Sequence, residues 1–200
     1  MSEYRYVPGA TTIGIVCTDG VILASEKRVS YGGLVISRKG KKVFKITDRI
    51  GAACAGLISG MQSLVREAAV KANLFRLDVG RPISVTSATK LVSNLLFNQR
   101  QNPLSTQTIV GGIDEKGTSL YVLDVSGSVI PDKYVAVGSG AGIAIGILEE
   151  EYKENITTEE ARELVVRAIK SAVSRDIMSG DGIDFLIITK DGVQEESMEF

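Results

Sequence analysis

The stretch Gly9–Ile15, which reads GATTIGI, decides how the start of this chain is interpreted. From Thr11 to Thr18, β-branched residues alternate with small ones, a composition typical of a β-strand. Asp19-Gly20 then forms a tight turn into the apolar run Val21–Ala24. We therefore expect a β-hairpin near the N-terminus, with Ala10 at the entrance to its first strand.

Length and composition fit one folded domain and exclude several classes of partner. The chain has 200 residues, 44% of them hydrophobic, and a formal net charge of -1. A chain of this length can bury most of its apolar surface in one domain. Without a block of like charges, neither nucleic acid nor a membrane is indicated as a partner. No apolar run is long enough to span a membrane and no signal peptide is evident, so we expect a cytoplasmic protein.

The chain contains no histidine, which narrows the chemistry open to it. Ser-His-Asp and Cys-His catalysis are excluded, as is every zinc site built on imidazole. The two cysteines, Cys17 and Cys54, lie apart in apolar segments, and we interpret them as reduced, buried core thiols. No metal or organic cofactor is indicated.

The order of predicted elements is strands, two helices, strands, two helices and a final strand. Antiparallel sheets with segregated helices indicate an α+β fold. Helices are expected after Ser59, from the N-cap Ser84, and from Thr157, whose capping-box partner is Glu160. The other expected elements are a hairpin joining Leu34–Ile36 to Val43–Ile46, the strand Ile50–Gly56, a sheet block over Thr106–Val125, the strand Asp184–Thr189 and a short polar tail.

An N-terminal threonine protease is one of the few hydrolytic arrangements possible without histidine. It needs a threonine hydroxyl as nucleophile and the free α-amine as base, whose ordinary pKa of about 7.7–8.0 suits neutral pH. It also needs a cation beside the hydroxyl, a carboxylate that holds this cation, and backbone N–H groups that bind the oxyanion.

Several separated motifs resemble those of archaeal-type proteasome β subunits, in the same order. They are Gly9–Ile15, Ala24–Arg28, Gly40–Phe44, Ala55-Gly56, Gly111–Asp114, Gly138–Gly140 and Ser174–Gly180. The resemblance covers the chain from Gly9 to about Val193. It implies the four-layer αββα sandwich of the N-terminal nucleophile hydrolases, with residues 1–9 as a propeptide and residues 10–200 as one β-type domain.

The resemblance also implies a role for each matching residue. Ala10 stands at the nucleophile position, where the family has threonine, so the chain as written is expected to be inactive and to keep its propeptide. Lys42 matches the catalytic lysine, Glu26 its carboxylate partner, and Gly56 the oxyanion N–H. The remaining matches are Ser139, Asp176 and Ser179 near the terminal amine. The expected substrate pocket is mostly apolar and consists of Val29, Phe44, Cys54, Ile58 and Gln62.

Simpler interpretations of single residues remain open at this point. Glu26 and Arg28 could form an exposed ion pair, Lys42 could lie on a solvated hairpin, and the glycine-rich loop from Gly138 could be a plain strand-to-helix turn. A slip of one residue would make Thr11 the nucleophile, because neighbouring side chains of a strand face opposite sides. The ungapped register keeps Glu26, Lys42 and Gly56 in step with the family, and we favour Ala10.

The resemblance implies partners as well. These are proteasome α subunits and other β subunits in stacked heptameric rings, an ATPase regulator, and unfolded proteins as substrates. Ala10 is either a substitution in a catalytic subunit or natural in a noncatalytic one. The alternatives are a purely structural ring subunit, the related bacterial two-ring peptidase, and a nucleotide-binding α/β protein.

Overall fold

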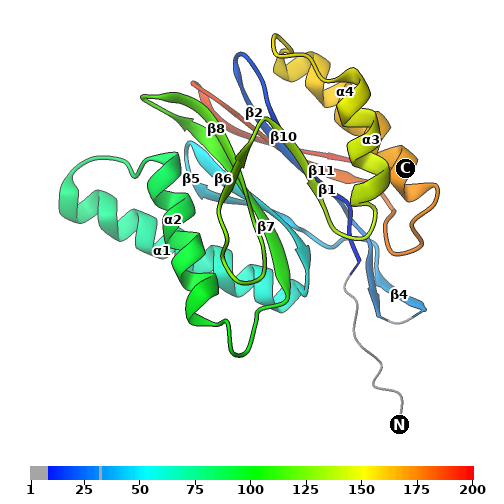
Figure 1. Ribbon diagram of the computed structural model, residues 1–200, viewed down its shortest axis with the longest axis horizontal. Coiled ribbons are helices and arrows are strands. Elements are labelled where there is room, and N and C mark those ends of the chain that lie inside the picture. The colour runs from blue at the N-terminus through cyan, green and yellow to red at the C-terminus, as the bar shows by residue number, and fades with distance from the viewer. Residues whose placement is uncertain (1–8, 32) are drawn as a thin grey trace.

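In the computed structural model, which describes residues 9–31 and 33–200, two five-stranded sheets are stacked face to face (Figure 1). The first sheet has the order β10-β1-β2-β11-β12, and the second has the order β5-β6-β7-β8-β9. Every strand pair in them is antiparallel. The strands of the first sheet are β1 (Thr12–Val16), β2 (Gly20–Glu26), β10 (Tyr134–Val137), β11 (Ile183–Thr189) and β12 (Gly192–Met198). Those of the second are β5 (Val43–Thr47), β6 (Ile50–Gly56), β7 (Thr106–Asp114), β8 (Gly117–Leu123) and β9 (Ile130–Asp132).

Two pairs of helices cover the outer faces of the sheets (Figure 1). Helices α1 (Ile58–Val79) and α2 (Val85–Asn98) bury an apolar cluster against the second sheet, around Met61 and Val92. Helices α3 (Ala141–Glu151) and α4 (Thr158–Val173) do the same on the first sheet, around Leu164. A third cluster fills the space between the sheets. The four layers are therefore αββα, as the resemblance implied.

Local sequence signals set the helix starts. Ser84 accepts a hydrogen bond from the Ser87 N–H and caps α2. Thr157 and Glu160 form both hydrogen bonds of a capping box at the start of α4. Both predicted caps are confirmed.

The predicted hairpin joining Leu34–Ile36 to Val43–Ile46 was wrong. The segment Leu34–Ser37 (β4) pairs with Val29–Tyr31 (β3) in a separate two-stranded sheet, whereas β5 pairs with β6. The reason is that the Gly40 N–H donates to the Lys27 carbonyl, which holds the chain beside the end of β2 before β5 begins. The polar tail is also structured, because most of it forms β12 along the edge of β11.

Of the predicted propeptide, residues 1–9, Gly9 alone lies among the described residues. The described helices include none that is long and apolar enough to cross a membrane.

Candidate active site

Ala10 lies between the two sheets, two residues before the start of β1. Its backbone N–H donates to Ser139 Oγ over 3.1 Å, and its carbonyl accepts from the Gly140 N–H over 3.2 Å. Ala10 is fully buried and belongs to the cluster between the sheets, together with Val43 and Ala55. Those two residues are the chain neighbours of Lys42 and Gly56. The main chain at position 10 is thus fixed by the loop after β10.

The side chain of Thr11 has different surroundings from that of Ala10. Its hydroxyl lies 2.8 Å from Ser179 Oγ, and the residue is fully buried. Gly140 makes room for it, since a Cβ on Gly140 would lie 2.0 Å from Thr11 Oγ1. The alternation of side chains along a strand therefore sends Ala10 and Thr11 into different surroundings.

Thr11, Ser139, Asp176 and Ser179 form a hydroxyl cluster. Asp176 Oδ2 accepts from Ser139 Oγ over 2.5 Å and from Ser179 Oγ over 2.6 Å. An ionised carboxylate can only accept, so both serine hydroxyls donate to it. Ser139 Oγ is then left to accept from the Ala10 N–H, and Ser179 Oγ to accept from Thr11. The cluster orders the backbone nitrogen of residue 10.

Lys42 and Glu26 form a charged pair. Lys42 Nζ donates to Glu26 Oε1 and to the Arg28 carbonyl, the latter over 2.7 Å. Their side chains are 1% and 0% exposed. This burial contradicts both simpler interpretations, the exposed Glu26–Arg28 pair and the solvated lysine hairpin. The pair is a buried ion pair instead.

Backbone groups complete the surroundings of Glu26. Its Oε2 accepts from the N–H groups of Arg28 over 2.7 Å and of Gly180 over 3.0 Å. Burial raises the pKa of Glu26 above its ordinary range, while Lys42 and these two N–H groups act in the opposite direction. Every oxygen of this carboxylate therefore has a partner, as a buried charge requires.

Gly56, the predicted oxyanion residue, ends β6 with a φ of 137°, in a conformation that favours glycine. A Cβ there would lie 2.2 Å from the Ser105 carbonyl oxygen.

A buried hydrogen-bonded bridge connects the two sheets just before Gly56, and the sequence interpretation did not include it. Thr12 Oγ1 donates to the Cys54 carbonyl over 3.0 Å and lies 2.8 Å from Ser25 Oγ. The alternation that puts Thr12 on the same face as Ala10 is the signal that could have pointed to it.

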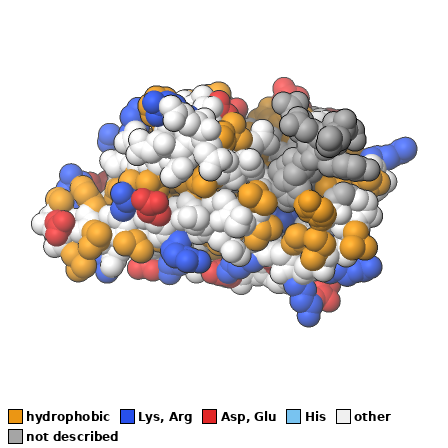
Figure 2. Space-filling model, turned by 90° about the horizontal axis from the view of Figure 1, so that it is seen from below, with side chains coloured by type: hydrophobic (Ala, Val, Ile, Leu, Met, Phe, Trp, Pro, Cys, Tyr) orange, Lys and Arg blue, Asp and Glu red, His pale blue; other side chains and the backbone are white. Residues whose placement is uncertain are grey.

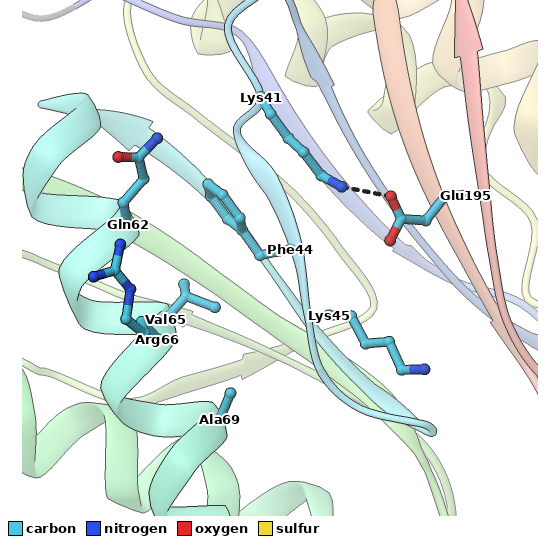
Figure 3. Close-up of a pocket in the computed structure, with 8 residues that line it drawn as sticks. All are labelled: Lys41, Phe44, Lys45, Gln62, Val65, Arg66, Ala69 and Glu195. Carbon is cyan, nitrogen blue, oxygen red and sulfur yellow. Dashed lines mark hydrogen bonds and ion pairs between the residues drawn. The ribbon is translucent and has the colours of Figure 1, made fainter.

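The five predicted pocket residues are not equally accessible, and two of them, Phe44 and Gln62, are drawn in Figure 3. Phe44 and Gln62 line an open cleft of about 490 Å³ between β5 and α1. Val29 and Ile58 are half-buried, and Cys54 is fully buried in the core beneath the helices. The cleft is mixed in character rather than mostly apolar, because its other lining residues are Lys41, Lys45, Val65, Arg66, Ala69 and Glu195.

Both cysteines are buried free thiols, as predicted. Burial raises the pKa of Cys17 and of Cys54 to about 12 in each case, so both stay protonated near neutral pH. Among residues 9–31 and 33–200, no group of three or more histidine, cysteine, aspartate or glutamate side chains is placed to hold a metal ion.

Comparison with known proteins identifies the family. The family model described as "Proteasome subunit" matches residues 7–188. "Proteasome subunit beta 2" of Caldivirga maquilingensis is 46% identical over 201 residues, which cover 100% of both chains. This chain belongs to the proteasome β subunits. "Proteasome subunit beta 1" of Nitrosopumilus maritimus is 45% identical, over 97% of this chain and 98% of the relative. "Proteasome subunit beta 1" of Desulfurococcus amylolyticus is also 45% identical, over 97% and 96%.

Membership gives the β subunit a general chemistry, because the proteasome β type is a threonine protease family. The predicted residues Glu26, Lys42, Ser139, Asp176 and Ser179 come from four separate segments of the chain. Ser139 contacts Ala10 and is joined to Asp176 and Ser179 by hydrogen bonds, while Glu26 pairs with Lys42 and accepts from the Gly180 N–H, next to Ser179. Asp181 was missed by the sequence interpretation, although it lies in the turn-like sequence Gly180-Asp181-Gly182 directly after the recognised motif.

Proposed function

We propose that this β subunit belongs to the 20S proteasome core, which degrades unfolded proteins by threonine-type endopeptidase chemistry. It is inactive as written, because Ala10 occupies the nucleophile position. The observation that carries the proposal is the surroundings of Ala10: its N–H is held by Ser139, and its buried methyl group shares a cluster with the neighbours of Lys42 and Gly56. Each group required around a threonine hydroxyl has a candidate there, and the hydroxyl itself is missing.

The roles follow from the positions of these groups. With threonine at position 10, the Lys42 ammonium would stabilise the developing alkoxide, and Glu26 holds that ammonium in place. The Gly56 N–H would bind the oxyanion of the tetrahedral intermediate. Ser139, Asp176 and Ser179 would hold the terminal amine, which acts as the base.

Gly9 supports the same assignment. A Cβ at Gly9 would lie 2.0 Å from Met178 Cβ and 3.1 Å from Ser139 Oγ, so a side chain is not accommodated before position 10. This suits a site where the residue at position 10 attacks the preceding carbonyl. In the chain as written, Ala10 cannot attack, and residues 1–9 stay attached as the propeptide of a β-type domain that spans residues 10–200.

Thr11 is the alternative nucleophile. Its hydroxyl donates to Ser179, while the Lys42 ammonium is occupied by Glu26 and the Arg28 carbonyl. Deprotonation of the Thr11 hydroxyl would require a cation beside it. Its observed partner is instead the Ser179 hydroxyl, which in turn donates to the Asp176 carboxylate. These contacts support Ala10 as the nucleophile position.

The partners in this proposal are proteasome α subunits and other β subunits, assembled in stacked heptameric rings in the cytoplasm. An ATPase regulator would supply unfolded proteins. The predicted pocket of Val29, Phe44, Cys54, Ile58 and Gln62 would receive the substrate residue before the cut. A purely structural ring subunit is the second candidate, and the absence of a hydroxyl at position 10 favours it for the chain as written.

The substitution Ala10→Thr tests the proposal. Assembled with α subunits, the variant is expected to lose residues 1–9, detected by intact mass, and to hydrolyse reporter peptides. Its matched control is the double variant Ala10→Thr with Lys42→Ala, which should keep the propeptide. Loss of Met1–Ala10 from the chain as written would make Thr11 the nucleophile. An Ala10→Thr variant that assembles but stays uncut would leave only the structural role.

A further inference from the structure

The segment between α4 and β11 carries three groups of the site and ends on an unusual backbone conformation. It holds Asp176, Ser179 and the N–H of Gly180. Asp181 then adopts a φ of 70°, in the left-handed region that few residues other than glycine enter. Ser105 is the other residue with such a φ among the non-glycine residues that the structure describes.

The Arg28 side chain contacts this segment at two points. Its Nε lies 2.9 Å and its Nη2 3.4 Å from the two carboxylate oxygens of Asp181, a forked contact that fixes orientation as well as distance. Arg28 Nη1 also donates to the Ile177 carbonyl over 3.0 Å. Gly180 lies flat against the guanidinium, since a Cβ there would be 2.3 Å from Nη2. The Asp181 side chain is only 8% exposed, and its Oδ1 also forms an ion pair with Arg38 Nη1 at 3.4 Å.

The backbone of the same arginine belongs to the charged pair. The Arg28 carbonyl accepts from Lys42, and the Arg28 N–H donates to the Glu26 carboxylate, which also accepts from the Gly180 N–H. Arg28 thus contacts the charged pair through its main chain and the segment 176–181 through its side chain. The contact with Asp181 joins the two.

We propose that Asp181 is a positioning residue of this site. Its carboxylate fixes the Arg28 guanidinium, and through it keeps the Gly180 N–H on Glu26 and Ser179 against Thr11. Asp181 itself contacts neither residue 10 nor Lys42 by any described hydrogen bond or ion pair. The inference rests on the proposed function for its catalytic consequence, but its structural consequence can be measured in the chain as written.

The structural test is amide hydrogen exchange of the chain as written, compared with Asp181→Asn. The variant should exchange the Gly180 amide at least about 10-fold faster, while Ala161 in α4 exchanges as before. Asp191→Asn, in an exposed turn, is the matched control and should change neither amide. Unchanged exchange at Gly180 in Asp181→Asn would overturn the proposal without touching the proposed function.

The catalytic test uses the assembled Ala10→Thr protein. Adding Asp181→Asn should slow self-cleavage and lower kcat by roughly 10- to 100-fold, because small displacements of positioned groups have effects of this size. KM should stay within about 2-fold, and the pH profile of kcat should shift, because Glu26 loses a hydrogen-bond donor. Asp181→Glu should recover part of the rate.

The failures of the two proposals are distinguishable. If Ala10→Thr alone is not cut, the proposed function fails, and the exchange measurement still decides the role of Asp181. If Ala10→Thr is cut and Asp181→Asn leaves both rate and pH profile unchanged, the positioning role is wrong. Should Asp181→Asn not fold, Arg28→Lys carries the same test, because a lysine retains the charge and loses the fork. A rate unchanged by Arg28→Lys would also overturn it.

Discussion

The charged pair of Lys42 and Glu26 and the hydroxyl cluster around Asp176 are held in different ways. Lys42 and Glu26 are two buried charges whose partners are each other and backbone groups. In the hydroxyl cluster, the Asp176 carboxylate accepts hydrogen bonds from the neutral hydroxyls of Ser139 and Ser179, and Ser139 is exposed to solvent. The charged pair therefore depends on both members being present, whereas the hydroxyl cluster can lose one donor and keep the others.

Removing one charge should give the largest effect. Lys42→Met leaves Glu26 buried without its counter-ion, and we expect the free energy of unfolding to fall by about 3–5 kcal/mol. Adding Glu26→Leu should recover most of this loss, because no uncompensated charge remains. Urea unfolding at pH 7 measures both.

Lys45→Met is the matched control for this change. Lys45 pairs with Asp48 at the surface, with 44% of its side chain exposed, and should lose less than about 1 kcal/mol. Equal losses for Lys42→Met and Lys45→Met would remove the distinction drawn between a buried and an exposed charge.

Removing a hydroxyl should have a smaller effect. Ser179→Ala takes one donor from Asp176 and the acceptor from Thr11, and we expect a loss of about 1–3 kcal/mol in the free energy of unfolding. Ser63→Ala, on the exposed face of α1, should stay within about 0.5 kcal/mol. A loss for Ser179→Ala as large as that for Lys42→Met would mean that the two sides of the site are equally intolerant.

The smallest expected effect on stability comes from the contact between Arg28 and Asp181, which joins the charged pair to the segment 176–181. The hydrogen bond from Arg28, together with the charges of Arg28 and Arg38, lowers the pKa of Asp181 below its ordinary value of 3.8. A lowered carboxyl pKa contributes stability that is fully present above the unfolded-state pKa and lost as pH falls through the folded-state pKa. The stability difference between the chain and Asp181→Asn should therefore be constant from pH 5 to 7 and shrink below about pH 4. A difference that grows in acid would contradict the assignment of the charge to Asp181.

Much of the fold could be predicted because its signals are local. The caps at Ser84 and Thr157 and the buried run Ile50–Gly56 each identify one element by themselves. Pairing between elements is less local. Leu34–Ile36 has the composition of a strand, but nothing in it specifies β3 rather than β5 as its partner. The tail lacks an apolar pattern, and an edge strand needs only backbone hydrogen bonds along one side.

The site divides in the same way. Matching motifs named Glu26, Lys42, Ser139, Asp176 and Ser179, and the fold brings them together. The direction of the Thr11 hydroxyl could not be read from a motif, since it depends on the space left by Gly140. Asp181 was missed for a similar reason, because its partner Arg28 lies 153 residues away in the chain. Cys54 could be assigned to a pocket by position, whereas its full burial is a property of the packed helices.

The order of strands determines which parts of the fold can form early during translation. The second sheet and its two helices use one continuous stretch, from Val43 to Asp132, so a ribosome can deliver them as a unit. The first sheet pairs β1 and β2 with β10 and β11. It can therefore be completed only after the last part of the chain has been synthesised. Closure of the first sheet, and with it the surroundings of position 10, therefore depends on residues that are translated last.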